Sequence, residues 1–264
     1  MQNTITTHNG LFHADEVMAI AILRLYGIDY PVIRTRDQAV ITDSAYVVDV
    51  GGVHDEATNR YDHHQYRGGK ASAGLVWDEF GEELCDRTLP DETAQLFVTK
   101  VYETLIADID AIDTGTRRPA KGEFSFSHAI SSFNATGEVG TPEHEAGFNA
   151  ALEFAKQVLI NTIATVHKEL YDLAEIKLAM ADQPIVPVFP RYLVGMGEQA
   201  KLYGYKRFFF PDANGNGWRV QITEGAEPLD DLVKEDSGLI FLHPAKFICG
   251  VKEVSDAVRV ATCW

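Results

Sequence analysis

Residues 45–52 read AYVVDVGG, a short apolar run that two glycines stop. A run that is hydrophobic on both faces is typical of a buried strand in a parallel sheet. Residues 4–8 (TITTH) alternate and are rich in β-branched side chains, and residues 30–36 (YPVIRTR) contain a third extended segment. Between these two, an apolar segment from Asp15 to Gly27 predicts a helix. Strands that alternate with helices indicate an α/β fold with a doubly wound, mainly parallel sheet.

The rest of the chain extends this pattern into two parts. Helices are predicted over residues 72–84 and 93–113. Residues 143–181 carry apolar side chains at steps of three or four, which predicts one long helix that links two lobes. The alternative for this helix is the seam of a coiled-coil dimer.

The composition changes after residue 181, where DQPIVPVFPR is rich in proline. A β-hairpin is predicted over residues 205–225, around the turn DANGNG. Two strands within 238–251 and a helix over 252–261 complete a smaller α/β domain. We therefore predict a catalytic domain at 1–182, which includes the long helix, and a substrate-binding domain at 183–264.

Charge and composition limit the class of protein. The 264 residues carry a formal net charge of −16, whereas proteins that grip long nucleic acids non-specifically are usually basic. The longest apolar run, residues 17–23, is too short to cross a membrane, and the N-terminus has no secretory pattern. Three widely spaced cysteines fit a reduced environment. These features predict a cytoplasmic protein with no membrane partner.

Four separated segments place histidine or aspartate at the end of a predicted element. These residues are His8, His13 and Asp15; Asp49; Asp62, His63 and His64; and Asp110 and Asp113. In an open α/β sheet the ends of the strands converge on one crevice. Aspartate also favours loops and caps for purely local reasons, but four such segments together predict a shared site.

Mixed histidine and carboxylate ligands without cysteine suit Mn²⁺, Fe or Zn²⁺ better than Ca²⁺. The ligands suffice for two metal ions, and Asp49, inside an apolar strand, is the candidate that bridges them. Two ions about 3.5–4 Å apart activate water for in-line attack on phosphorus. The pattern therefore predicts phosphoester hydrolysis. Asp110 is interpreted as a cap or as an acid that orients a ligand.

Few cations are placed to hold an anionic substrate. Arg34 and Arg36 follow a predicted strand, where a guanidinium suits phosphate, although a surface ion pair is an equal alternative. Arg117, Arg118 and Lys121 form the one local basic cluster, directly after Asp113.

The strings THNGLFHADE, RTRD, VVDVGG, YDHHQ, SAGLVW and AIDTG resemble the melanocyte-proliferating-gene (Myg) exonuclease family, within the DHH phosphoesterase superfamily. The similarity extends through ISSFNAT, FFFPDANGNGWRVQ and IFLHPAKFICG, and so covers most of the chain. It implies a DHH-like catalytic lobe, a smaller second lobe and a centre of two Mn²⁺ ions, with Mg²⁺, Fe or Zn²⁺ as alternatives. It also implies 3′–5′ exonuclease activity on RNA or short single-stranded oligonucleotides.

Carried over by position, the resemblance implies roles for individual residues. The implied metal ligands are His8, His13, Asp15, Asp49, His63 and Asp113. Asp49, Asp62 and His64 are the implied catalytic residues, and His64 also faces the substrate. His243 and Lys246 of the second lobe join Arg34, Arg36, Arg117 and Arg118 as implied substrate-binding residues.

Adjacent residues on an extended chain point to opposite faces, so His63 and His64 are expected to serve different partners. The resemblance implies that His63 faces the metal and His64 the phosphate. Two other functions stay open. One is a phosphodiesterase or pyrophosphatase for small molecules, which the acidic composition favours. The other is a non-catalytic metal-binding protein. A homo-oligomer is compatible with either.

Overall fold

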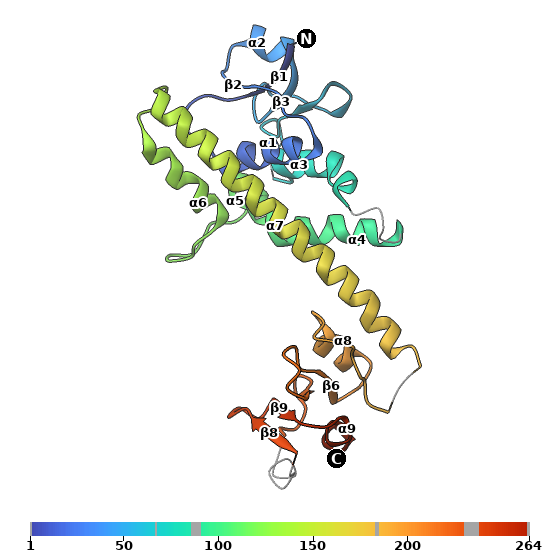
Figure 1. Ribbon diagram of the computed structural model, residues 1–264. Coiled ribbons are helices and arrows are strands. Elements are labelled where there is room, and N and C mark those ends of the chain that lie inside the picture. The colour runs from blue at the N-terminus through green and yellow to red at the C-terminus, as the bar shows by residue number, and fades with distance from the viewer. Residues whose placement is uncertain (1, 67, 86–90, 183–184, 230–237, 263–264) are drawn as a thin grey trace. The chain divides into compact units, whose positions relative to one another are not determined.

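The computed structural model describes residues 2–66, 68–85, 91–182, 185–229 and 238–262 (Figure 1). The chain divides into two compact units, residues 1–167 and 168–264. Helix α7 (Pro142–Met180, 39 residues) begins in the first unit and ends in the second. The predicted long helix is thus confirmed, whereas the boundary between residues 182 and 183 stays a prediction.

A five-stranded sheet forms the centre of the first unit, in the order β2-β1-β3-β5-β4. All neighbours are parallel except β4 and β5, which pair antiparallel. The strands are β1 (Gln2–Thr7), β2 (Val32–Arg34), β3 (Ser44–Val48), β4 (His54–Asp55) and β5 (Arg60–Tyr61). The AYVVDVGG run therefore supplies the middle strand of the sheet, as predicted.

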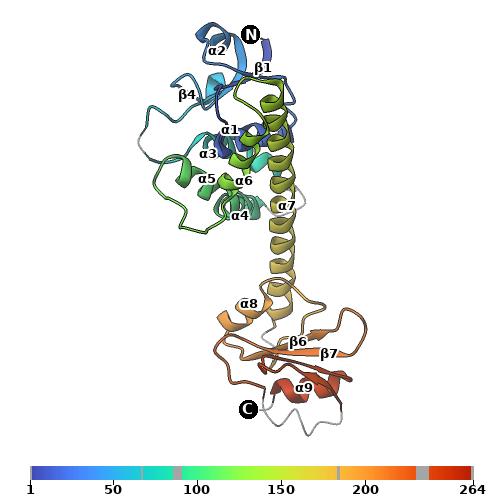
Figure 2. The same cartoon turned by 90° about the vertical axis from the view of Figure 1, so that its left-hand side faces the viewer.

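Helices cover both faces of this sheet (Figures 1 and 2). Helix α2 (Gln38–Asp43) contacts β1 and β3 on one face. Helices α1 (Ala14–Tyr26) and α3 (Ser72–Phe80) pack against each other on the other face. Since α1 also contacts two further helices, it is buried on nearly every side, which explains its almost continuous apolar sequence.

The segment predicted as one helix over residues 93–113 contains a change of helical type. Helix α4 (Asp91–Val101) passes through a π-helical turn, η3 (Tyr102–Ile106), into α5 (Ala107–Asp113). A π-turn inserts one residue into the helical repeat, and the apolar spacing alone does not reveal it. Both η3 and α5 contact α3. The π-turn therefore changes which face of α5 packs against α3.

The N-terminus of α3 is held by two buried carboxylates from other helices. Asp15 accepts hydrogen bonds from the amides of Ser72 (3.1 Å) and Ala73 (2.7 Å), and Asp110 accepts one from Gly74 (3.1 Å). The positive end of the helix is therefore satisfied by the protein's own anions. Burial raises the pKa of Asp110 to about 6, against the opposing hydrogen bonds from Tyr102 and Gly74.

Replacing Gly74 by alanine is expected to lower the free energy of unfolding by about 2–3 kcal/mol, because overpacking and a lost hydrogen bond add. A Cβ at this position would lie 2.1 Å from Oδ2 of Asp110. Chemical denaturation followed by circular dichroism measures the change. The matched control is Gly197→Ala, where a new Cβ would lie 3.6 Å from the ring of Phe208. Equal stability of the two variants would contradict the role given to Asp110.

The remaining elements of the first unit are one helix and three short helical turns. Helix α6 (Phe126–Ser132) precedes α7, and short turns of helix lie at η1 (Glu56–Thr58), η2 (Glu82–Leu84) and η4 (Phe133–Thr136). Most apolar positions of α7 that the spacing predicted, such as Phe148, Leu152 and Leu159, are buried within this chain. The helix therefore needs no coiled-coil partner to cover them. None of the described helices is long and apolar enough to cross a bilayer.

The second unit contains a four-stranded antiparallel sheet in the order β6-β7-β9-β8. Its strands are β6 (Arg207–Pro211), β7 (Trp218–Ile222), β8 (Leu239–Leu242) and β9 (Ile248–Val251). Phe208 and Phe210 pack with residues of α8 (Met196–Leu202), and Phe209 packs with residues of α9 (Val254–Thr262). The predicted hairpin and small domain are confirmed. The three phenylalanines therefore form core on both faces of the sheet.

Candidate metal centre

The chain after strands β1, β3 and β5 opens onto one pocket of the first unit. Its volume is about 550 Å³. The residues that line it are His8, His13, Arg36, Asp49, His63, His64, Tyr66, Gly68, Asp113 and Thr114. Five of the six predicted metal ligands therefore meet in this pocket. The sixth, Asp15, is fully buried within 4.8 Å of donor atoms of His63 and Asp113.

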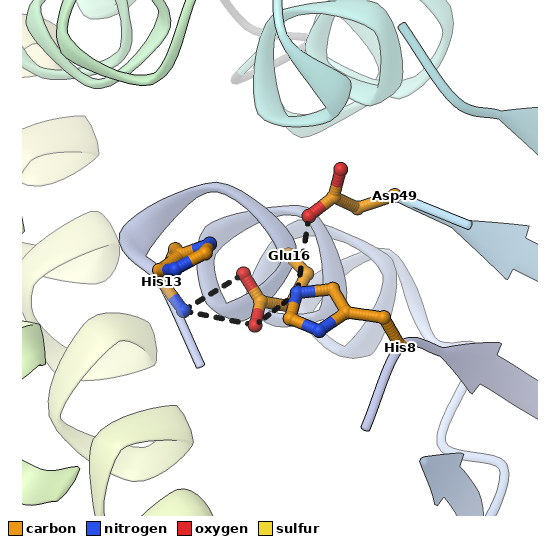
Figure 3. A group of neighbouring side chains, drawn as sticks. All are labelled: His8, His13, Glu16 and Asp49. Atoms are coloured by element: carbon orange, nitrogen blue, oxygen red, sulfur yellow. Dashed lines mark hydrogen bonds and ion pairs between the residues drawn. The ribbon is translucent and has the colours of Figure 1, made fainter. Parts of the chain in front are cut away.

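His8 follows β1 and is buried in an orientation typical of a metal ligand (Figure 3). Its Nδ1 lies 3.0 Å from the carbonyl oxygen of Asn9, which can only accept, so Nδ1 carries the proton. Nε2 then points toward the carboxylates of Glu16 (3.1 Å) and Asp49 (3.3 Å), where a bound cation would replace its proton. A backbone carbonyl that fixes the tautomer in this way prepares the other nitrogen for a cation.

Asp49 follows β3 and adopts a left-handed backbone conformation with φ 53°. Aspartate and asparagine tolerate this region better than most residues, and such conformations gather at functional sites. The carboxylate is buried, with Oδ2 toward His8. Oδ1 makes no hydrogen bond among the described residues and lies 3.6 Å from Nδ1 of His63 and 3.4 Å from Nδ1 of His64. Asp49 thus stands between two groups of donors.

The second group combines His63 with two acids from helices. Nε2 of His63 lies 3.0 Å from Asp113, the last residue of α5, and Nδ1 lies 3.7 Å from Asp15 in the first turn of α1. The hydroxyl of Ser72, at the start of α3, is 3.3 Å from the same Nδ1. The N-terminus of α3 therefore fixes both Asp15 and His63.

Asp62 supports His64. Its Oδ1 accepts hydrogen bonds from the backbone amide (3.0 Å) and Nδ1 (2.7 Å) of His64, and its Oδ2 accepts one from Gly52 (2.6 Å). Burial would raise the pKa of Asp62, but these hydrogen bonds outweigh it and hold the pKa below its ordinary value. Since Nδ1 of His64 is bound to Asp62, its Nε2 remains for the pocket.

The two histidines of YDHHQ differ in exposure, but they do not lie on opposite faces. The side chain of His63 is 10% exposed and that of His64 is 64% exposed. Their rings are nonetheless stacked, with centroids 4.6 Å apart. Strand β5 ends at Tyr61, and the amide of Tyr66 bonds the carbonyl of His63 (2.9 Å) in a turn. The chain therefore turns at His64 and Gln65 instead of continuing as an extended strand through His64.

Glu16 is a member of the site that the sequence motifs did not reveal. It is fully buried, and both its oxygens accept from the backbone amide of His13, at 2.9 and 3.1 Å (Figure 3). The same carboxylate faces Nε2 of His8. An acid three residues after a helix-capping position is the signature of a capping box, and HADE has this spacing from His13 to Glu16.

The carboxylates create a negative potential around the histidines. Burial would lower the pKa of His8, but Asp49 and Glu16 outweigh it and raise this pKa to about 10. The pKa of His63 is also raised, since Asp113 and Asp49 outweigh burial. Burial and the neighbouring Asp49 and Asp113 raise the pKa of Asp15. The same field would stabilise a bound cation.

The donor atoms fit divalent cations. Three groups each hold their atoms within 4.8 Å of one another: His8, His13, Glu16 and Asp49; Asp49, Asp62, His63 and His64; and Asp15, His63 and Asp113. Neighbouring ligands of one ion with bonds near 2.1 Å are separated by about 3 Å, and the closest donor pairs here approach that distance. Asp49 belongs to the first two groups and His63 to the last two.

The predicted arginines lie in different surroundings. Arg36 lines the pocket and donates to Oδ1 of Asn9 (2.7 Å). Arg34 turns away to Glu145 (2.7 Å) and the carbonyl of Gly10 (2.5 Å). It is not among the lining residues, which favours the ion-pair alternative for this side chain.

Apart from His64, the remaining predicted substrate residues are not among those that line the pocket. Arg117 pairs with Asp108 and Glu123, each at 2.6 Å, and Arg118 is exposed. His243 and Lys246 belong to the second unit, where the amide of Lys246 bonds the carbonyl of His243 (2.7 Å). Their roles toward the substrate stay predictions. Tyr66 and Thr114, which the motif analysis did not single out, do line the pocket.

Asn134 holds the loop that carries the first histidines. Its amide oxygen accepts from the backbone amide of Phe12 (3.1 Å), and its amide nitrogen donates to the carbonyl of Phe12 (2.8 Å). His144, fully buried at the start of α7, donates to the same Asn134 oxygen (3.1 Å). Phe12 lies directly before His13, so this amide pair fixes the position of His13.

Replacing Asn134 by alanine is expected to lower the free energy of unfolding by about 2–3 kcal/mol, since the buried amide of Phe12 would lose its partner. Affinity for Mn²⁺ is expected to fall by about tenfold or more, as for other residues that orient ligands. Denaturation and calorimetric Mn²⁺ titration measure the two effects. Asn149→Ala is the control, because that exposed amide only bonds a carbonyl of its own helix. A variant with normal Mn²⁺ affinity would refute the link to His13.

The chain is similar in sequence to a described protein family and to several known proteins. Residues 4–186 match a family model named MYG1_exonuc, described as "Uncharacterised protein family (UPF0160)". The human "MYG1 exonuclease" is 32% identical over 186 residues, which cover 60% of this chain and 50% of that protein. A MYG1 protein of Caenorhabditis elegans is 27% identical over 325 residues, covering 99% of this chain and 94% of that protein. The chain thus spans about half the length of its human relative.

Among solved structures, RecJ from Thermus thermophilus in complex with Mg²⁺ is similar over 98% of this chain and 49% of that chain. The identity is 15% and the TM-score is 0.33, which is too low to establish a common fold.

Proposed function

Because this chain belongs to the MYG1 exonuclease family (UPF0160), we propose that it is a divalent-metal-dependent hydrolase of phosphodiesters. The observation that carries the proposal is the placement of Asp49. A buried carboxylate, in a left-handed turn, presents one oxygen to each of two groups of histidine and acid donors. A bridging carboxylate in a two-metal hydrolase needs this arrangement.

In this proposal Asp49 would help to hold two cations. His8 and His13 would hold the first, with Glu16 beside them, and Asp15, His63 and Asp113 would hold the second. Ligands of mixed nitrogen and oxygen type favour Mn²⁺, with Mg²⁺, Fe and Zn²⁺ as alternatives. The bound ions would supply an activated water molecule and would neutralise charge at the phosphate.

The side chains of the pocket bind and orient the phosphodiester. His64, held by Asp62 through Nδ1, presents Nε2 to the pocket and, when protonated, donates to a phosphate oxygen or to the leaving oxygen. Asp62 acts by fixing the ring of His64. Arg36 is the guanidinium placed to pair with a further phosphate.

The proposed substrate is the 3′ end of RNA or of a short single-stranded oligonucleotide, cut in the 3′–5′ direction. The name of the human relative supports exonuclease activity as such, whereas the choice of RNA and the 3′–5′ direction rest on the family resemblance of the sequence motifs. The net charge of −16 favours short substrates over long polymers, because a long polyanion would meet the acidic surface. A cytoplasmic location and the oligomeric state stay predictions.

A direct test uses the purified protein with Mn²⁺ and oligonucleotides labelled at either end. A ladder of shortened products from 5′-labelled RNA, with single nucleotides released from 3′-labelled RNA, is expected. Parallel reactions with DNA of the same sequence, a cyclic dinucleotide and pyrophosphate separate the nuclease from a small-molecule enzyme. If no substrate is turned over by wild type beyond the level of Asp49→Asn, the hydrolase proposal is wrong.

A further inference from the structure

A second hollow, of about 360 Å³, adjoins the metal centre between helices α5 and α6. We call it the α5/α6 groove, and its lining residues are His13, Ala14, Asp15, Ile109, Ile112, Asp113, Ser127 and Ser131. Ile109 and Ile112 are three residues apart on α5, and Ser127 and Ser131 are four apart on α6. Each pair therefore shares one helix face, so one wall of the groove is apolar and the other bears hydroxyls.

The groove and the pocket meet at the candidate metal ligands. His13 and Asp113 line both hollows. A phosphodiester has one sugar on each side of its phosphorus atom. If this phosphate binds at His13 and Asp113, the nucleoside on one side of it would lie in the pocket and the nucleoside on the other side would lie in the groove.

The two hollows differ in charge. The pocket is lined by Arg36 and by the exposed imidazole of His64. The described residues that line the groove include no lysine or arginine, and their carboxylates, Asp15 and Asp113, face the metal centre. Further phosphates of a chain thus belong on the pocket side. The groove suits a group that carries no phosphate beyond the one being cut.

We propose that the α5/α6 groove is the subsite for the uncharged terminal nucleoside, with a free 3′ hydroxyl. The proposal rests on the hydrolase function given above and adds the residues that select a chain end. Ile109 and Ile112 pack against the base or the sugar. Ser127 and Ser131 bond the sugar hydroxyls: the Ser131 hydroxyl donates to a carbonyl of its own helix (2.9 Å) and can still accept. A terminal 3′ phosphate would meet no lysine or arginine among the described residues that line the groove.

The test is a change of preference, which misfolding cannot imitate. Binding of a 5′-fluorescein tetraribonucleotide is measured by anisotropy in Mn²⁺, with the 3′ end either hydroxyl or phosphate. The scissile linkages are replaced by phosphorothioates, which keep the negative charge and slow cleavage. Wild type is expected to prefer the 3′ hydroxyl. Ser131→Lys is expected to shift the ratio of the two affinities toward the 3′ phosphate by about fivefold or more, the effect of one added charge pair.

Two further variants complete the design. Ser132→Lys adds the same charge on the next position of α6, outside the groove lining, and is expected to leave the ratio unchanged. Ser127→Phe fills the groove and is expected to weaken binding of the 3′ hydroxyl form by tenfold or more, with Mn²⁺ affinity measured by calorimetry as the control.

The outcomes separate the two proposals. Binding or cleavage by wild type, with an unchanged ratio for Ser131→Lys or equal shifts for both lysine variants, overturns the groove assignment alone. If wild type neither binds nor cuts any oligonucleotide, the nuclease function and the groove assignment both fail.

Discussion

Asp49→Asn is expected to lower phosphodiester cleavage in Mn²⁺ by on the order of 10³-fold, which corresponds to about 4 kcal/mol of transition-state stabilisation. The substitution removes the one negative charge that faces both groups of donors, Oδ2 toward His8 and Oδ1 toward His63. Asparagine keeps the size of the side chain and tolerates the left-handed backbone at this position, so the fold is retained.

The same variant is expected to have a thermal stability close to that of wild type when both are free of metal. Loss of the charge relieves repulsion of the buried carboxyl of Asp15, but it also removes an attraction to the imidazoles of His8 and His63, whose pKa values Asp49 raises. Near-normal thermal stability together with lost activity would distinguish a functional residue from a structural one. Asp182→Asn, which removes the same charge at an exposed turn, is the control. A variant that cleaves at more than a tenth of the wild-type rate would overturn the bridging role of Asp49.

Metal binding is expected to produce the second large effect, on thermal stability. Mn²⁺ at a hundred times its dissociation constant stabilises the folded protein by about 2.7 kcal/mol, which raises the melting temperature of a unit of this size by about 5–11 °C. Metal binding is expected to raise and not lower the stability because a cation would neutralise the negative charge of the carboxylates, the same charge that raises the pKa values of His8 and His63. Removal of the ion with a chelator is expected to reverse the shift and to abolish cleavage.

Differential scanning fluorimetry across a Mn²⁺ titration measures this shift. Asp49→Asn and Asp113→Asn are expected to show less than half of the wild-type rise at the same concentration. Ca²⁺ serves as a comparison, because the imidazole donors of His8 and His63 suit it poorly. Equal rises for wild type and both variants would mean that Mn²⁺ binds elsewhere.

The fold of the first unit could be predicted because hydrophobic spacing is a local property. AYVVDVGG is apolar on both faces, and the structure places it between two parallel neighbours. The length of α7 could likewise be predicted, since its buried side chains repeat with the helical period. The π-turn η3 was not visible, because one inserted residue barely alters the apolar pattern.

The part of the site that could be predicted consists of the residues that directly follow a strand. His8, Asp49 and His63 converge in one pocket as the order of the strands requires. The orientation of each side chain depended on contacts between distant segments, which one sequence does not reveal. Arg34 is turned away by Glu145, 111 residues later, and Phe12 is held by Asn134, 122 residues later. Glu16 was within reach of prediction, because its spacing from His13 matches a capping box.

The clamp on Phe12 also determines when the centre is assembled during synthesis. Every candidate metal ligand has been translated by Asp113, yet Asn134 and His144, which fix the loop before His13, come later. A nascent chain that ends between these points carries all the ligands on an unsupported loop, and closing that loop requires the start of α7. Ion capture is therefore a late event of folding, and a polypeptide truncated at residue 120 should bind Mn²⁺ far more weakly than one that extends through α7.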